Sequence, residues 1–135
     1  MYLLDTDILS NLLKRVPSPT LVAKLASVPI EQQFTSSITL GELVYGACRE
    51  VTRRDALLEQ VDRVLLANRR VLPFGAAAAR GYGELKAELE RLGRPLAEAD
   101  LRIAAIALAR SLTLVTGNVR HFQRVPGLAV ENWLE

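Results

Sequence analysis

Two aspartates follow the first apolar residues of the chain with almost no spacer. Asp5 and Asp7 come directly after the run Tyr2-Leu3-Leu4 and before the apolar pair Ile8-Leu9. A short apolar run that breaks into polar residues and then resumes helical spacing is typical of a buried strand that leads into a helix. Asp5 is then expected at the carboxyl end of the strand, the edge where open parallel sheets bind ligands. We therefore predict that Asp5 anchors a metal site.

Asp100 lies in another apolar segment, inside a helix that the sequence predicts over residues 97–110. At about 100° per residue, Asp100 shares the face of the apolar residues three, four and seven positions later. Glu98 instead faces outward with Arg102, as an i,i+4 surface ion pair. An unpaired buried carboxylate is costly, and a bound cation removes that cost. The alternative is an acid that only complements the dipole of the helix N-terminus.

Glu42 and Asn118 are predicted at the same edge of the sheet, each after a strand. The segment Thr39-Leu40-Gly41-Glu42 also fits a capping box, which by itself would account for the glutamate. Asn118 follows a strand that ends at Thr116, where its side chain could bind a metal-bound water or shape a turn with Gly117. For both residues the functional and the structural interpretation remain open.

Three polar neighbours complete the candidate site. We interpret Asp7 as the N-cap of the helix that starts at Ile8, with metal support as its secondary role. Thr6 and Thr116 border the acids and are predicted to support them. Because Asp5, Glu42 and Asp100 are hard oxygen ligands from separate segments, they suit Mg²⁺ or Mn²⁺ rather than zinc. One or two such ions, roughly 3.5–4 Å apart if two, would orient a phosphate and activate water.

The elements that must position these residues alternate between strand and helix. The predicted strands are the opening run, 33–36, 71–74, 112–116 and 128–130; the predicted helices are 8–13, 20–27, 39–50, 55–68, 76–92 and 97–110, with a polar turn at 117–122. Helical crossovers between strands imply parallel pairing and helices on both faces. We therefore predict a three-layer α/β/α sandwich with a mostly parallel central sheet, in a single domain of residues 1–135.

Composition narrows the class of protein. Charged residues interrupt every apolar stretch well before the roughly 20 residues of a membrane span, and no signal peptide is visible, so we expect a cytoplasmic protein. The single cysteine, Cys48, excludes an internal disulfide framework and is interpreted as core filler on an apolar helix face. His121 is interpreted as a solvated turn residue. A net charge of +2 permits nucleic-acid binding without requiring it.

Four segments together resemble the PIN-domain nucleases. They are Leu3-Leu4-Asp5-Thr6-Asp7, Ile38-Thr39-Leu40-Gly41-Glu42-Leu43, Ala99-Asp100-Leu101-Arg102-Ile103-Ala104-Ala105 and Val115-Thr116-Gly117-Asn118. Their order and the length of the chain are similar to the VapC toxins of bacterial toxin–antitoxin pairs. The segment from Phe122 to Leu128 is similar to that of enteric VapC members that cut initiator tRNA in its anticodon loop.

This resemblance implies a metal-dependent endoribonuclease in which Asp5, Glu42 and Asp100 hold Mg²⁺ or Mn²⁺ and hydrolysis leaves a 3′-hydroxyl and a 5′-phosphate. It also implies an RNA substrate, a homodimer and a cognate VapB-type antitoxin that inserts a segment into the active site. Many PIN domains have a fourth aspartate where this chain has Asn118, so the resemblance supports a second ion less well.

Basic residues are the candidates for RNA contact. Fourteen of the seventeen basic residues are arginine, whose planar group binds phosphate in a bidentate manner. Arg49, Arg120 and Arg124 are candidate phosphate contacts, with ordinary surface charge as the alternative.

Two further classes of protein remain open. A phosphatase of the haloacid dehalogenase type also begins with a strand and Asp-x-Asp, with the first aspartate as nucleophile, but it expects Gly-Thr where this chain has Ile8-Leu9. It also expects a late lysine, and Lys14, Lys24 and Lys86 follow no late strand. The other alternative is a non-catalytic α/β binding module.

Overall fold

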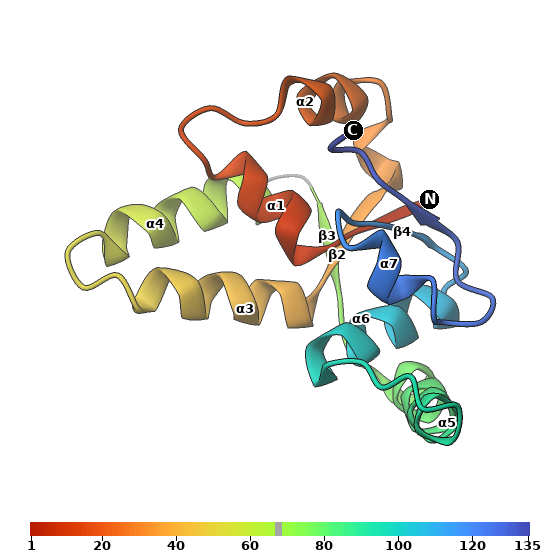
Figure 1. Cartoon of the computed structure of the whole chain (residues 1–135). Coiled ribbons are helices and arrows are strands. Elements are labelled where there is room, and N and C mark those ends of the chain that lie inside the picture. Colours follow the sequence, from red (N-terminus) through yellow and green to blue (C-terminus); the bar gives the residue numbers. More distant parts are fainter. Residues whose placement is uncertain (67–68) are drawn as a thin grey trace.

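The computed structural model describes residues 1–66 and 69–135 and contains a five-stranded sheet in which every pair of neighbouring strands is parallel (Figure 1). The strand order is β3-β2-β1-β4-β5. The strands are β1 (Tyr2–Leu4), β2 (Gln33–Ser36), β3 (Arg70–Leu72), β4 (Thr113–Val115) and β5 (Val130–Glu131). The predicted parallel sheet is confirmed.

Helices cover both faces of the sheet. One face carries α1 (Thr6–Leu12), α2 (Pro19–Ala26), α3 (Ser37–Cys48) and α4 (Arg54–Val61), which continues as the wider turn η2 (Asp62–Leu66). The short η1 (Ile30–Gln32) leads into β2. The other face carries α5 (Ala76–Arg91), α6 (Glu98–Ala109) and the short α7 (Val119–Phe122). Figure 1 shows α3 and α4 on the opposite side of the strands from α5. The predicted three-layer α/β/α sandwich is confirmed.

The adjacent residues Leu3 and Leu4 of β1 pack into different hydrophobic cores, one on each face of the sheet. Leu3 packs with Phe34 and Leu114 in the cluster beneath α5 and α6, whereas Leu4 packs in the cluster of α1 and α2. Both leucine side chains are fully buried, as the twofold alternation of a strand requires when each face is covered. Truncating either leucine to alanine should cost about 2–5 kcal/mol of unfolding free energy.

The strand order places a topological switch beside β1. The chain runs from β1 through β2 to β3 on one side and then crosses back to β4 and β5 on the other. In open α/β sheets, ligands bind in the crevice outside the carboxyl ends of the strands, at the point where the strand order reverses in this way. The amide of Asp5 donates to the carbonyl of Val115 at 2.9 Å, so the residue after β1 is held directly against β4 at this point.

Several predicted boundaries match the structure and others do not. The predicted helix 20–27 matches α2 to within one residue at each end; Ser18 caps it, and Pro19 occupies the first helical position, where proline is favoured. The predicted polar turn at 117–122 contains α7 (Val119–Phe122), so that prediction is wrong from residue 119 onward. The predicted helix 55–68 extends to residues 67 and 68, which lie outside the described part of the chain. Within residues 1–66 and 69–135, no helix combines the length and apolarity that crossing a bilayer requires.

Cys48 is exposed, so its prediction as core filler is wrong. The buried residues of α3 are Thr39, Leu43 and Ala47, which follow one another at intervals of four. Cys48 is the last residue of the helix and falls one position beyond this stripe. The apolar face of α3 is therefore narrower than its composition suggests.

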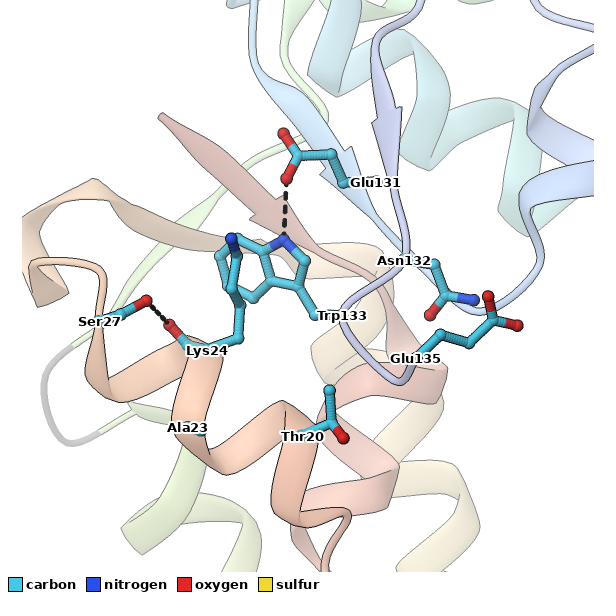
Figure 2. Close-up of a pocket in the computed structure, with 8 residues that line it drawn as sticks. All are labelled: Thr20, Ala23, Lys24, Ser27, Glu131, Asn132, Trp133 and Glu135. Carbon is cyan, nitrogen blue, oxygen red and sulfur yellow. Dashed lines mark hydrogen bonds between the residues drawn. The ribbon is translucent and has the colours of Figure 1, made fainter.

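The C-terminal segment is fastened to α2 by Trp133. Its side chain is 2% exposed, its ring lies 4.9 Å from that of Tyr2, and its indole N–H donates to Glu131 Oε1 at 3.0 Å. Figure 2 shows this ring beside Lys24, at the edge of a hollow of about 510 Å³ between α2 and the chain end. We call this hollow the C-terminal hollow.

Candidate active site

A pocket of about 460 Å³ opens at the carboxyl ends of β1 and β4, and acidic side chains from distant segments of the chain line it. Its lining residues are Asp5, Thr6, Asp7, Ser10, Asn11, Lys14, Glu42, Asp100 and Asn118. We call it the carboxylate pocket. The structure thus brings Asp5, Glu42 and Asp100 to one rim; their catalytic and metal-binding roles stay a prediction.

Asp5 is the most deeply buried acid of this pocket, at 3% exposure. It caps α1: its Oδ1 accepts from the Thr6 amide at 2.8 Å, and its Oδ2 accepts from the Thr116 hydroxyl at 2.8 Å. Burial, followed by the charge of Asp7, raises the pKa of Asp5 from 3.8 to about 7, despite the hydrogen bonds from Thr116 and Thr6 that lower it. The carboxyl is therefore held in a place where its negative charge lacks compensation.

Asp7 is not the N-cap of α1, and that prediction is wrong because Asp5 occupies the capping position. Asp7 lies in the first turn of the helix and reaches across to the segment after β4. Its Oδ2 accepts from the Gly117 amide at 2.8 Å, and its Oδ1 lies 3.4 Å from the Thr116 hydroxyl. A Cβ at Gly117 would lie 2.7 Å from Asp7 Oδ2, so this contact needs a glycine.

Glu42 does not belong to a capping box. The N-cap of α3 is Ser36, whose hydroxyl accepts from the Thr39 amide at 3.0 Å, so Glu42 lies well inside the helix. Its Oε1 accepts from the Thr6 hydroxyl at 2.6 Å. Thr6 consequently links two acids of the pocket, with its amide on Asp5 and its hydroxyl on Glu42. The structure removes the capping interpretation and leaves the functional one.

Asp100 faces the pocket while Glu98 faces away from it, as the helix-face argument predicts. Asp100 is half-buried, and its pKa is raised first by burial and then by the charge of Glu42. Glu98 is exposed and binds Lys86 at 2.5 Å and Arg102 at 3.7 Å. His121, an exposed residue of α7, acts in the opposite direction and lowers the pKa of Asp100.

The supporting residues occupy different depths. Thr116 is buried beneath Asp5, and its hydroxyl also accepts from the Asn118 amide at 3.0 Å. The Asn118 side chain is exposed at the rim of the pocket. Thr116 therefore shapes the turn that presents Asn118, while Asn118 itself stays accessible to a ligand.

The three candidate arginines lie in different places. Arg49 lines a groove that shares Thr6, Ser10 and Glu42 with the carboxylate pocket. Arg120 lines another hollow, which shares Asn118 with it. Arg124 donates to the carbonyl of Pro95 at 3.0 Å and lines neither. Arg49 and Arg120 line hollows that adjoin the carboxylate pocket, whereas Arg124 holds a loop. The predicted phosphate contacts of all three stay a prediction.

Sequence reasoning missed three residues of the pocket, Ser10, Asn11 and Lys14. They follow Asp7 by three, four and seven positions, so they share its face as the chain passes through and beyond α1. This periodicity was the signal that could have found them. Of the described residues that line the pocket, Lys14 is the one base. A phosphate drawn to this rim would meet its ammonium group.

The donor chemistry of the pocket fits a hard divalent cation. Within the described ranges, no three Asp, Glu, His or Cys side chains already stand close enough to hold one metal ion together. Mg²⁺ does not need such a cage, because it is commonly held by one or two carboxylates, waters and substrate phosphates. Burial and the charge of Asp7 raise the pKa of Asp5, so a bound cation would stabilise its ionised form. Carboxylate oxygens without thiolate or imidazole partners favour Mg²⁺-like ions over zinc.

Comparison with known proteins gives the class. The sequence matches the PIN domain over residues 2–128. It is 38% identical to the tRNA(fMet)-specific endonuclease VapC of Shigella flexneri, over 98% of this chain and 97% of the relative. It is 35% identical to ribonuclease VapC2 of Rickettsia felis, over 98% of both chains. The DNA-bound VapBC of Salmonella typhimurium superposes with a TM-score of 0.89 at 33% identity, over 98% of this chain and 97% of the other.

The chain therefore belongs to the PIN-domain family, in its VapC group. The predicted family is confirmed, and the haloacid dehalogenase alternative is wrong. PIN-domain ribonucleases generally depend on divalent metal ions, which agrees with the oxygen donors at this rim.

Proposed function

We propose that this chain is a divalent-metal-dependent endoribonuclease, the toxin of a VapBC-type toxin–antitoxin pair, and that residues 1–135 act as one PIN-like unit. The observation that carries the proposal is the carboxylate pocket. Asp5 at the start of α1, Glu42 of α3 and Asp100 of α6 are separated by dozens of residues and line one rim at the switch point of the sheet. VapC-named ribonucleases related over the whole chain support the same activity.

Each acid has a defined part in this proposal. Asp5, the buried acid, is the anchor of the ion, and Asp100 and Glu42 face it from the neighbouring helices. Mg²⁺ or Mn²⁺ bound by these carboxylates would neutralise them and polarise the phosphodiester. Thr6 and Thr116 orient the carboxylates through their hydrogen bonds, and Asp7 holds the segment after β4 in place. Asn118 is the neutral member of the rim and favours one ion over two.

The substrate proposed is RNA, with tRNA as the first candidate. A relative with 38% identity over nearly the whole chain is named as specific for tRNA(fMet). Arg49 and Arg120 border hollows joined to the carboxylate pocket and are the proposed phosphate contacts. The proposed partner is a VapB-type antitoxin, because a solved relative is a VapBC complex. A second copy of this chain is proposed from the resemblance to the VapC toxins alone.

The test compares acids that line the carboxylate pocket, Asp5 and Asp100, with Glu98, an acid of α6 that faces away from the pocket. Purified chain is incubated with tRNA in Mg²⁺, in Mn²⁺ and in EDTA, and cleavage products are mapped. Asp5→Asn and Asp100→Asn should abolish divalent-dependent cleavage, while Glu98→Gln, two residues from Asp100 and outside the pocket, should retain it. Circular dichroism checks that each variant is folded.

Full cleavage by both Asp5→Asn and Asp100→Asn would refute the assigned site. Wild-type protein that cleaves no RNA but binds its antitoxin would instead support the non-catalytic binding module. An equal loss in Glu98→Gln would show that the wrong acid of α6 had been chosen.

A further inference from the structure

A groove of about 510 Å³ runs from the carboxylate pocket along the surface between α1, α3 and α4. It shares Thr6, Ser10 and Glu42 with the pocket, so the two hollows are continuous. Figure 1 shows α3 and α4 as a pair of neighbouring helices, with α3 beneath α1 and α4 to the left of it. A polymer whose backbone reaches the acids would therefore find a second binding surface directly beside them.

The groove carries an exposed aromatic ring with a cation on it. Tyr45 is 64% exposed and follows Glu42 by three residues on α3, so the two side chains lie on neighbouring parts of one helix face. The guanidinium carbon of Arg49 lies 5.0 Å from the centre of the tyrosine ring, within cation–π range. A ring held in this way is pre-oriented and offers a flat apolar surface to a ligand.

The rest of the lining fits a nucleotide. Leu13 at the end of α1, Leu43 of α3 and Leu57 of α4 supply apolar surface, and Arg53 adds a second guanidinium near Arg49 on the same wall. Proteins that bind single-stranded nucleic acid combine aromatic rings, on which bases stack, with cations that follow the phosphates. The acids of the carboxylate pocket lie at one end of the groove, and Arg49 and Arg53, with Glu50 between them in the sequence, line the other end. This arrangement matches a strand whose cleaved phosphate binds a cation at the acids and whose next phosphate binds an arginine.

The spacing agrees with this path. Three residues of helix rise about 4.5 Å, so Tyr45 stands roughly that far along α3 from Glu42. Stacked bases are about 3.4 Å apart along one strand. The ring therefore stands slightly more than one base step along α3 from Glu42, the acid that faces the carboxylate pocket.

We propose that Tyr45, with Arg49 packed on its ring, forms a stacking subsite for the base of the nucleotide adjacent to the cleaved bond of single-stranded RNA. The proposal rests on the ribonuclease activity proposed above and adds a recognition element to it. Stacking tolerates all four bases, so the subsite holds the strand in place and leaves the choice of sequence to other contacts.

The experiment uses a short single-stranded RNA containing the cleaved sequence, with 2-aminopurine placed in turn on each side of the bond. Stacking on tyrosine quenches this base, and the quench is measured in the Asp5→Asn background to prevent cleavage. We expect Tyr45→Ala to abolish the quench and Tyr45→Phe to keep it. In the otherwise wild-type chain, Tyr45→Ala should raise KM roughly tenfold and leave kcat nearly unchanged.

Two controls separate stacking from loss of structure. Val22→Ala changes another exposed apolar side chain, 48% exposed on α2 and outside the groove, and should leave the quench and KM unchanged. An abasic nucleotide at the quenched position should raise the wild-type KM and produce no further increase in Tyr45→Ala, because the same contact is already lost.

Unchanged quench and KM in Tyr45→Ala would overturn the subsite even if the wild type cleaves RNA. An effect of Tyr45→Ala on antitoxin binding alone would overturn it as well, since the groove would then serve a protein segment. If the wild type cleaves no RNA, the ribonuclease proposal fails by that result alone. The subsite is then judged by the quench of 2-aminopurine RNA. If the Asp5→Asn protein shows no quench, the stacking subsite is refuted.

Discussion

The carboxylate pocket and the C-terminal hollow are similar in size but differ in how they hold their acids. The volumes are about 460 and 510 Å³, and each hollow contains carboxylates and one lysine. In the C-terminal hollow, Glu131 and Glu135 are exposed, and Glu131 receives the indole N–H of Trp133 (Figure 2). In the carboxylate pocket, Asp5 is buried beside other acids, and its pKa rises to about 7.

Buried, uncompensated charge therefore marks a functional site better than volume does. An exposed carboxylate is solvated by water and costs nothing to keep ionised. A carboxylate such as Asp5 must be neutralised by a proton or by a cation, and at neutral pH both compete for it. Substitutions in and around the two hollows should accordingly differ in effect, with the largest expected at Asp5.

Asp5→Asn should stabilise the metal-free protein at pH 8. The pKa of Asp5 is higher in the folded chain than in the unfolded one, so the folded state binds the proton more tightly between about pH 4 and pH 7. The free energy of unfolding therefore falls as pH rises through this window and levels off above it. A rise from 3.8 to about 7 corresponds to about 4 kcal/mol. Urea unfolding of the wild type and Asp5→Asn in EDTA at several pH values measures this difference in unfolding free energy. A wild-type unfolding free energy that rises between about pH 4 and pH 7 would contradict the prediction.

Gly117→Ala should destabilise the protein by about 1–3 kcal/mol, because its Cβ would overlap the Asp7 carboxylate. The amide that binds Asp7 would be displaced together with the turn that presents Asn118. Thermal unfolding and cleavage assays measure both effects. Glycine at 127 has a positive φ but no neighbour within 4 Å, so Gly127→Ala is a control for strain without overlap, and its cleavage activity should remain. Equal activity in both alanine variants would argue against a role for the Asp7 contact.

Thr6→Val should cost about 1 kcal/mol of stability and lower kcat/KM about tenfold. The hydroxyl that orients Glu42 is removed while the shape of the side chain is kept. The Thr6→Ser variant retains the donor and should recover most of the activity. Steady-state kinetics of the two variants decide the point, and equal activity in Thr6→Val and the wild type would mean that Glu42 needs no orienting partner.

Glu131→Gln should change stability by less than about 0.5 kcal/mol and leave cleavage unchanged. Glutamine keeps an oxygen acceptor for the indole of Trp133, and the side chain is solvated. Chemical unfolding and the tRNA assay measure this variant beside Asp5→Asn. A loss of cleavage in Glu131→Gln would place function in the C-terminal hollow and reverse the comparison.

Much of the architecture could be predicted because its signals are local. The apolar run before Asp5 and the punctuation at Ser18 and Pro19 are properties of neighbouring residues. The face of Asp100 also follows from helical periodicity, and the structure agrees with it. Placement at the rim then follows from the parallel sheet, since every strand ends at the same edge.

Contacts between distant residues could not be predicted in this way. Asp7 looks like a helix cap in sequence, yet its partner is Gly117, 110 residues away. Glu42 fits a capping box, and only the earlier start of α3 at Ser37 shows that the box is not formed. In both cases the sequence satisfied a local pattern that the structure does not form: a tertiary contact determined the outcome for Asp7, and the cap by Ser36 determined it for Glu42. Cys48 was also placed wrongly, because it falls one position beyond the buried stripe of Thr39, Leu43 and Ala47 on α3.

A pH titration of the Asp5 carboxyl, followed by ¹³C NMR with and without Mg²⁺, tests most directly whether these carboxylates form a cation site. In EDTA, we expect a pKa near 7, raised by burial and by Asp7. Saturating Mg²⁺ should lower this pKa toward the ordinary aspartate value of about 4, because a cation stabilises the ionised form. A pKa of Asp5 that does not respond to Mg²⁺ would contradict the assignment of a cation to this pocket.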